Sequence, residues 1–172
     1  MEVLVEKVTG ASLMRWACGL TIDSVSNAEL SDMYSCEHSP IRTQLFKITM
    51  IEIPTFVSTH FVRHNIGCIH YVKTQREDRG GSEDSNRWTP TNHGMLVNAQ
   101  ALINMARKRR CHKSHKETRE VMELILKGVA KVDKDLSYHL VPDCVYRGGC
   151  FELKSCGYYH RVRGLTYGED FI

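Results

Sequence analysis

The sequence predicts one α+β domain in which helices pack against a sheet. Its 172 residues are 42% hydrophobic, which is enough chain and enough apolar surface for a single core. Segments with alternating apolar residues, typical of strands, are interleaved with segments of helical spacing. Only 12 glycines and 4 prolines are present, and this composition excludes fibrous and linker-like classes.

The first part of the chain is predicted to form strand, helix, helix and strand. Val3 and Val5 alternate with polar residues, and this first strand ends near residue 10. Apolar residues at helical spacing predict short helices around 13–18 and 28–34. In residues 44–53, alternate side chains share one face, which predicts the second strand.

The rest of the chain is predicted to be mainly helical. Pro54 suits the first turn of a helix, where its missing N–H costs nothing. Residues 77–92 are polar and rich in glycine and serine, so we expect a connection there. Helices are predicted over 98–110 and 117–132, and the segment after Pro142 has no clear period.

Several classes of protein are excluded by the sequence. No apolar run approaches the ~18 to 20 residues that cross a bilayer. The charged N-terminal segment does not resemble a signal peptide, so we expect the seven cysteines to be reduced and the protein to be cytoplasmic, without membrane contact. The net charge of +3 does not by itself indicate nucleic-acid binding, although basic residues crowd into 107–119.

The densest polar cluster is residues 63–76, RHNIGCIHYVKTQR. It holds two arginines, two histidines, an asparagine and a threonine in fourteen residues. The planar fork of arginine matches two phosphate oxygens, and histidine donates or accepts near neutral pH. An anionic ligand with a ring, such as a nucleotide, needs these groups; a solvated loop with incidental charges is the alternative.

A second cluster covers residues 98–109, NAQALINMARKR. At about 100° per residue, a helix brings Arg109 almost back over Asn98, with apolar Leu102 and Met105 between them. Arg109 is therefore predicted to reach a buried phosphate at one end of this helix. The other basic residues here are expected to extend into water.

Together these clusters resemble the flavin-dependent thymidylate synthase (ThyX) family. Residues 63–65 begin the segment matching R-H-R-x-x-S-x-N-E-x-S-x-R, and with one inserted residue 74–76 match its end. Residues 38–40 (HSP) resemble the family's H-x-[ST]-P segment. Residues 98–109 resemble its N-A-R-S-L-M-N-F-L-N-L-R helix, and 114–115 continue the match. The resemblance spans roughly residues 36–142.

The resemblance implies a ThyX-like fold and the family's reaction, reductive methylation of dUMP to dTMP. FAD is the implied cofactor, with NADPH and methylenetetrahydrofolate as co-substrates and no side-chain nucleophile. It also implies a homotetramer whose active sites are shared between subunits. A bacterial or viral-host cytosol is the expected location.

Residue roles are implied only where this sequence matches the family's motifs. The implied FAD-binding residues are Ser39, Arg63, His64, Asn65, His70, Asn98 and Asn104. The implied substrate-binding residues are His60, Thr74, Gln75, Arg76 and Arg109, with the two arginines on the phosphate.

The sequence also departs from the family pattern. Asn65 replaces the third motif arginine, and the motif's Asn-Glu pair becomes His70-Tyr71, which removes a carboxylate. Only 21 residues separate Arg76 from Asn98, where the family has a helical segment whose arginine reads the uracil ring. Arg79 or Arg87 could replace that arginine, and the sequence does not choose between them.

We therefore expect residues 1–142 to form a ThyX-like domain with a shortened central helical segment over 77–97. Residues 143–172 are expected to form a cysteine-containing C-terminal extension. Our prediction for that extension is no metal; the weaker alternative is a zinc site, because thiolates and imidazole favour zinc. Its ligands would be Cys144, Cys150, Cys156 and His160.

Two alternatives to thymidylate synthesis stay open. A ThyX-like enzyme could modify another pyrimidine deoxynucleotide, which the lost carboxylate and the missing uracil-reading segment favour. A non-catalytic protein that binds nucleotides or nucleic acid is favoured only by the basic segment 107–119, since clustered lysine and arginine neutralise phosphates. No aromatic residues are interleaved in that segment, so nucleic acid is the less favoured partner.

Overall fold

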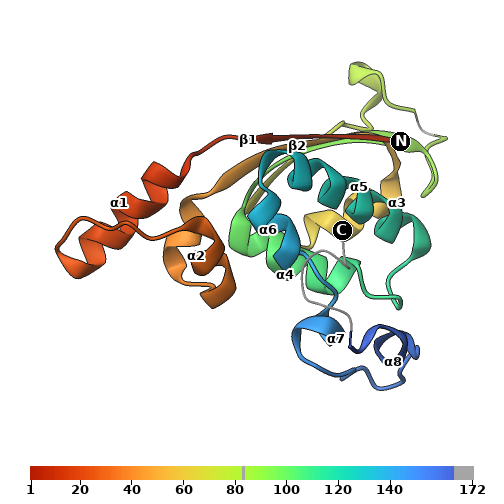
Figure 1. Cartoon of the computed structure of the whole chain (residues 1–172). Coiled ribbons are helices and arrows are strands. Elements are labelled where there is room, and N and C mark those ends of the chain that lie inside the picture. The colour runs from red at the N-terminus through yellow and green to blue at the C-terminus, as the bar shows by residue number, and fades with distance from the viewer. Residues whose placement is uncertain (83, 165–172) are drawn as a thin grey trace.

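A computed structural model describes residues 1–82 and 84–164, and its centre is an antiparallel sheet (Figure 1). In the described residues the sheet has four strands in the order β1-β2-β4-β3. Their bounds are β1 Glu2–Lys7, β2 Leu45–Pro54, β3 Cys68–Val72 and β4 Pro90–Asn98. The two central strands, β2 and β4, are each paired on both sides, and β3 is an edge strand.

The helices connect the strands and cover one side of the sheet (Figure 1). The α-helices are α1 Ala11–Ile22, α2 Leu30–Cys36, α3 Thr55–Val62, α4 Ala99–Arg109, α5 Lys116–Val132, α6 Lys134–His139, α7 Asp143–Tyr146 and α8 Tyr158–Val162. Two 3₁₀ turns are η1 Ser39–Thr43 and η2 Glu77–Arg79. No helix in the described part of the chain combines the length and the apolar character that a membrane span requires.

The core lies between this helical layer and one face of the sheet. Alternate residues of β2 and β4 are fully or almost fully buried there, including Phe46, Ile48, Met95 and Val97. They pack with α4 and α5, whose apolar sides are buried. The predicted α+β class with a single domain is confirmed.

The opposite face of the sheet is less covered. Ile69 and Tyr71 of β3 are 53% and 67% exposed, and Leu4 of β1 is 47% exposed. The pairing register places Tyr71, Gly94, Thr49 and Leu4 in one row across the four strands. This row gives the sheet a partly apolar outer surface.

The prediction was wrong for two of the four strands. Residues 90–97 were assigned to the connection 77–92 and to a shortened helical segment over 77–97, but they form the central strand β4. Residues 68–72, inside the polar cluster 63–76, form β3, a strand that the sequence pattern does not predict. Pro90, Asn92 and Gly94 disfavour a strand locally, but pairing with β2 and β3 and burial of alternate side chains outweigh that preference.

Close packing of α5 on β1 depends on Gly128. A Cβ built on Gly128 would lie 2.4 Å from Cγ2 of Val5, well inside van der Waals contact. The helix can approach the strand this closely only because the residue has no side chain.

We expect Gly128→Ala to lower the free energy of unfolding by about 1–3 kcal/mol, because overpacking a tight contact costs that much. Val5→Ala removes the facing methyl groups, so in the Gly128→Ala background it should restore part of the loss. Urea unfolding of the wild type, both single variants and the double variant measures this coupling. Additive effects of the two substitutions would contradict the assigned contact.

Candidate functional site

The loop joining α3 to β3 is fixed against the beginning of α4. Gly67 has φ +74°, a conformation that other residues rarely adopt, and its carbonyl accepts a 3.0 Å hydrogen bond from the Asn98 N–H. A Cβ on Gly67 would lie 2.5 Å from Nδ2 of Asn98. The Oδ1 of Asn98 caps α4 by accepting from the Ala101 N–H at 2.9 Å. Asn98 therefore organises the loop that carries Arg63, His64 and Asn65.

The other end of α4 reaches the same loop through Arg109. Its Nε donates to Nε2 of His64 at 2.8 Å, and its Nη2 donates to the carbonyl of His60 at 2.7 Å. His60 is held in turn by a 2.8 Å hydrogen bond between its Nδ1 and Oγ1 of Thr118 on α5. Asn98 and Arg109 are predicted to lie on one side of a helix. In the structure Asn98 contacts the end of the α3–β3 loop, and Arg109 contacts its beginning.

The imidazoles around Arg109 are held neutral. Burial, and next the positive charge of Arg109, lower the pKa of His64 to about 4. The same two causes lower the pKa of His60. Burial also lowers the pKa of Arg109, and the charge of Arg63 adds to this effect. The site therefore combines guanidinium groups with uncharged imidazoles, which suits binding of an anion.

A chain of buried and partly buried hydrogen bonds supports this loop. His70 on β3, predicted to contact FAD, bonds through Nε2 to the His64 carbonyl at 2.9 Å and through Nδ1 to Nε2 of His93 at 2.9 Å. Nδ1 of His93 lies 3.1 Å from Oγ of Ser58. Because a carbonyl only accepts, Nε2 of His70 carries a proton. With neutral rings, His93 then donates from Nε2 and accepts from the Ser58 hydroxyl.

Sequence reasoning missed Ser58 and His93. Both are buried, at 3% and 0% exposure. Burial lowers the pKa of His93 to about 4, and His70 contributes in the same direction. The sequence signal that could have identified His93 is its place two residues before Met95 and four before Val97, which gives the alternation of a strand.

Arg87 lies next to His60 on an aromatic surface. Its guanidinium carbon is 4.7 Å from the ring centroid of Phe56, whose ring is 5.7 Å from that of His60. Trp88 packs edge-on against Phe56 at 4.9 Å and remains 53% exposed. Arg79 lies in the exposed turn η2, and its guanidinium does not lie over the ring of Phe56 or of Trp88. The sequence leaves Arg79 and Arg87 as candidates to replace the family's uracil-reading arginine. Of these two, Arg87 lies beside the cluster of Arg109, His60 and His64, which we call the Arg109 cluster.

Two predicted FAD-binding residues, Asn104 and Ser39, lie away from this loop. Asn104 is exposed, and its Oδ1 accepts from Nη1 of Arg107 at 3.3 Å. Arg107 forms an ion pair with Glu37. Ser39, at the start of η1, lines an open cavity that Glu37 also lines. These residues form a second group, because Asn104 and Arg109 are about 140° apart around α4.

A third group of predicted site residues lies in the segment after β3, apart from the α3–β3 loop and from Asn104. It consists of Thr74, Gln75 and Arg76. Arg76 forms a two-fold hydrogen bond with Asp78, at 2.9 and 2.8 Å, and its side chain is 67% exposed. Oε1 of Gln75 accepts from the Ser85 hydroxyl at 2.9 Å. Within one chain the structure does not bring Arg76 and Arg109 to a common ligand.

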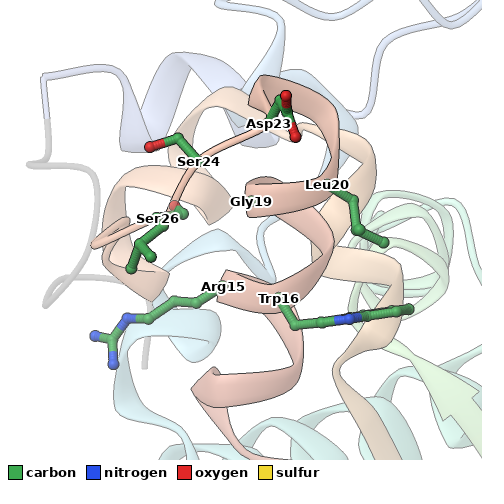
Figure 2. A pocket seen from close by; sticks show the side chains of 8 residues that line it. Arg15, Trp16, Gly19, Leu20, Asp23, Ser24 and Ser26 are labelled. Carbon is green, nitrogen blue, oxygen red and sulfur yellow. The ribbon is translucent and has the colours of Figure 1, made fainter.

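One open cavity has no predicted site residue in its lining. Figure 2 shows it between α1, which contributes Arg15, Trp16 and Leu20, and the turn that follows, which contributes Ser24 and Ser26. The side chains of Trp16 and Leu20 are 60% and 66% exposed. The cavity is therefore a surface feature of α1 and separate from the Arg109 cluster.

The basic segment 107–119 is mostly occupied by contacts within the protein. Arg110 bonds Glu123 and the Leu140 carbonyl, and Arg119 bonds the carbonyls of His112 and Ser114. Arg109 bonds to His60 and His64, and Arg107 forms an ion pair with Glu37. The arginines of this segment therefore do not form a continuous basic surface that could follow a nucleic-acid backbone, whereas Lys108, Lys113 and Lys116 are exposed.

The buried histidine chain gives a prediction for NMR. At about pH 8, where imidazoles are neutral, His70 and His93 should carry their proton on Nε2 and His64 on Nδ1. On acidification, His64 and His93 should stay neutral until the pH approaches about 4. Long-range ¹H–¹⁵N spectra of the rings measure both properties, and a proton on Nδ1 of His93 at pH 8 would contradict the assigned chain.

Comparison with known proteins identifies the fold. No protein-family model and no curated protein sequence matches the chain. Two solved structures of the flavin-dependent thymidylate synthase ThyX from Helicobacter pylori, each with FAD and dUMP, are similar at a TM-score of 0.65 and 14% identity. The match covers 84% of this chain and 99% of theirs. The UMP/dUMP methylase PolB from Streptomyces cacaoi, bound with 5-Br dUMP, matches at a TM-score of 0.60 and 14% identity, covering 80% and 94%.

The match includes nearly the whole length of each of these structures and at least 80% of this chain. The predicted resemblance is confirmed at the level of structure. The chain has the fold of the flavin-dependent thymidylate synthases.

Proposed function

We propose that the protein is an FAD-dependent thymidylate synthase-like enzyme. Its reaction would be the reductive methylation of dUMP to dTMP, with methylenetetrahydrofolate as carbon donor and NADPH as reductant. The observation that carries this proposal is the cluster of Arg109, His60 and His64, fixed to the motif loop 63–67 within this fold. A guanidinium beside neutral imidazoles suits a nucleotide phosphate.

The residues of the loop fit the polar groups of FAD. Arg63 and Asn65 are exposed, and among the described residues their side chains make no hydrogen bond, so the side-chain donors are available to a ligand. A guanidinium matches the pyrophosphate, and amide and imidazole groups match the ring edge. Bound there, FAD would supply the hydride chemistry. Arg63, Asn65 and His64 would bind and orient it, with His70 holding the His64 backbone in place.

The substrate end of the site would be formed around Arg109. Two of its donors already hold His60 and His64, so the remaining N–H groups would bind the phosphate. Arg76 would join this phosphate site, together with Thr74 and Gln75, only after it releases Asp78 and binds the substrate instead. At 67% exposure that surface ion pair is weak, so the exchange costs little.

A homotetramer with shared active sites would account for the separation of the implied ligand-binding residues. Asn104 and Ser39 lie on a different side of α4 from Arg109, and the segment 74–76 lies elsewhere again. The exposed side chains of Leu4, Ile69 and Tyr71 on the outer face of the sheet offer a surface for subunit contact. We propose that neighbouring subunits complete each site.

Another pyrimidine nucleotide is the second candidate substrate. A neighbour in structure is named as a UMP/dUMP methylase, so this fold is not restricted to one nucleotide. This chain has Tyr71 where the family motif has its glutamate, and Arg87 lies beside His60 on the Phe56 ring. We assign Arg87 to the base and Arg109 to the phosphate.

Flavin titration tests the first proposal. The purified protein should be yellow, or should change the absorbance of added FAD, and dUMP should strengthen or alter that change. Arg109→Gln should weaken dUMP binding at saturating FAD by about 10- to 100-fold, because charge-assisted hydrogen bonds contribute about 1.5–3 kcal/mol. Lys108→Gln, the exposed neighbour on α4, is the matched control and should bind as the wild type does.

A colourless protein that ignores saturating FAD, with folding intact by circular dichroism, would contradict the proposal. Equal dUMP affinity in the Arg109→Gln and Lys108→Gln variants would contradict the assigned role of Arg109 even if flavin binds.

A nucleotide panel tests the substrate. Release of tritium from the 5-position of dUMP, dCMP and UMP, measured with FAD, NADPH and methylenetetrahydrofolate, ranks the substrates. Arg87→Ala should reduce preference between bases while phosphate-dependent binding persists, and Arg79→Ala is the matched control. Unchanged base preference in Arg87→Ala would remove Arg87 from the base site, and a clear preference for another nucleotide over dUMP would favour the second candidate.

A further inference from the structure

Four cysteines that the proposed function does not use line one cavity. Cys144, Cys150 and Cys156 come from α7 and the loop after it, and Cys111 comes from the turn between α4 and α5. His112 lines the same cavity. The other cysteines of the chain lie on α1, at the end of α2 and on β3: Cys18, Cys36 and Cys68. The four therefore form a group that spans the main domain and the C-terminal extension.

The cavity has the size of a site for an ion. It leaves about 20 Å³ for a water-sized sphere, which is room for one water molecule or one ion and too little for an organic ligand. None of the lining cysteines is in a disulfide.

The extension contacts the main domain mainly through side chains at its surface: the Arg107 guanidinium lies 3.4 Å from the centroid of the Tyr146 ring, and His112 stacks on Tyr158 at 4.1 Å. α7 has four residues and α8 has five, and neither contains a buried residue. Phe151 and Leu153, between them, are 65% and 110% exposed. Helices this short are not stable on their own, and small segments without a core are commonly held by a metal or disulfides.

We propose that Cys111, Cys144, Cys150 and Cys156 bind one structural Zn²⁺ ion that fastens the C-terminal extension to the α4–α5 turn. Four thiolates in a tetrahedron are the preferred ligands of structural zinc. In the described residues no three His, Cys, Asp or Glu side chains form a metal-binding group, so binding requires the sulfurs to turn toward the cavity centre.

This ligand set differs from the weaker alternative suggested by the sequence. His160 is exposed and absent from the cavity lining, whereas Cys111 lies 33 residues before Cys144 and lines it. The spacings are wider than the usual pairs of zinc ligands, which is why the sequence pattern alone was weak.

Metal analysis of the full-length protein tests the proposal. Protein purified without chelators should contain one zinc per chain, and Co²⁺ added to the metal-free protein should give the intense absorption of tetrahedral thiolate coordination. Cys111→Ser should lose both signals. Cys36→Ser, which removes an exposed thiol outside the cavity, and His160→Ala should keep both.

A second variant and a thiol count make the test decisive. Cys156 is exposed, so Cys156→Ser should lose zinc without disturbing the fold, and it replaces Cys111→Ser if that variant misfolds. Trypsin should cut residues 147–163 at least ten-fold faster after chelation. Wild-type zinc content in the cysteine variants, zinc loss in His160→Ala, or fewer than seven free thiols in the denatured, unreduced protein would overturn the proposal.

Discussion

The contact on which the candidate site most depends is the hold of Arg109 on the end of α3. One guanidinium donates to the His60 carbonyl and to the His64 ring, and Asn98 meets Gly67 at the other end of the same helix. A loop that would otherwise be free at the sheet edge is thereby fixed at both ends. Because two of the donors of Arg109 are occupied, its remaining N–H groups point in a defined direction. A nucleotide site needs such preorganisation, since ordering a free arginine on binding costs affinity.

The buried histidine chain explains how the loop stays ordered without an added charge. His70 bonds to the His64 carbonyl, and His93 and Ser58 complete its hydrogen bonds inside the core. Burial keeps His64 and His93 uncharged, so the positive charge of the site comes from its arginines. Since these histidines bind protons less readily in the folded state than in the unfolded state, stability should rise with pH between about 4 and 6.5 and be lost on acidification.

Sequence predicted the parts of the fold and site that follow from local spacing. The helix after residue 98, the position of Arg109 over Asn98 and the start of a helix at Pro54 all depend on 3.6 residues per turn. Prediction from sequence failed where pairing between distant segments determines the secondary structure. β4 contains Pro90, Asn92 and Gly94, and it is a strand because it pairs with a strand on each side. Prediction from sequence also missed Ser58, His93 and Cys111, whose neighbours are far away in the chain. In our proposal, contacts between chains bring Asn104, Ser39 and Arg76 to Arg109, and spacing within one chain does not determine such contacts.

The central claim is that the Arg109 guanidinium, held by His60 and His64, binds the phosphate of the nucleotide. The Nε–H signal of Arg109 in ¹H–¹⁵N spectra measures this directly, because that N–H already donates to His64. With FAD present, dUMP should shift this signal in a saturable way, and deoxyuridine, which lacks the phosphate, should not. An Arg109 signal that is unmoved by saturating dUMP, or moved equally by deoxyuridine, would contradict it.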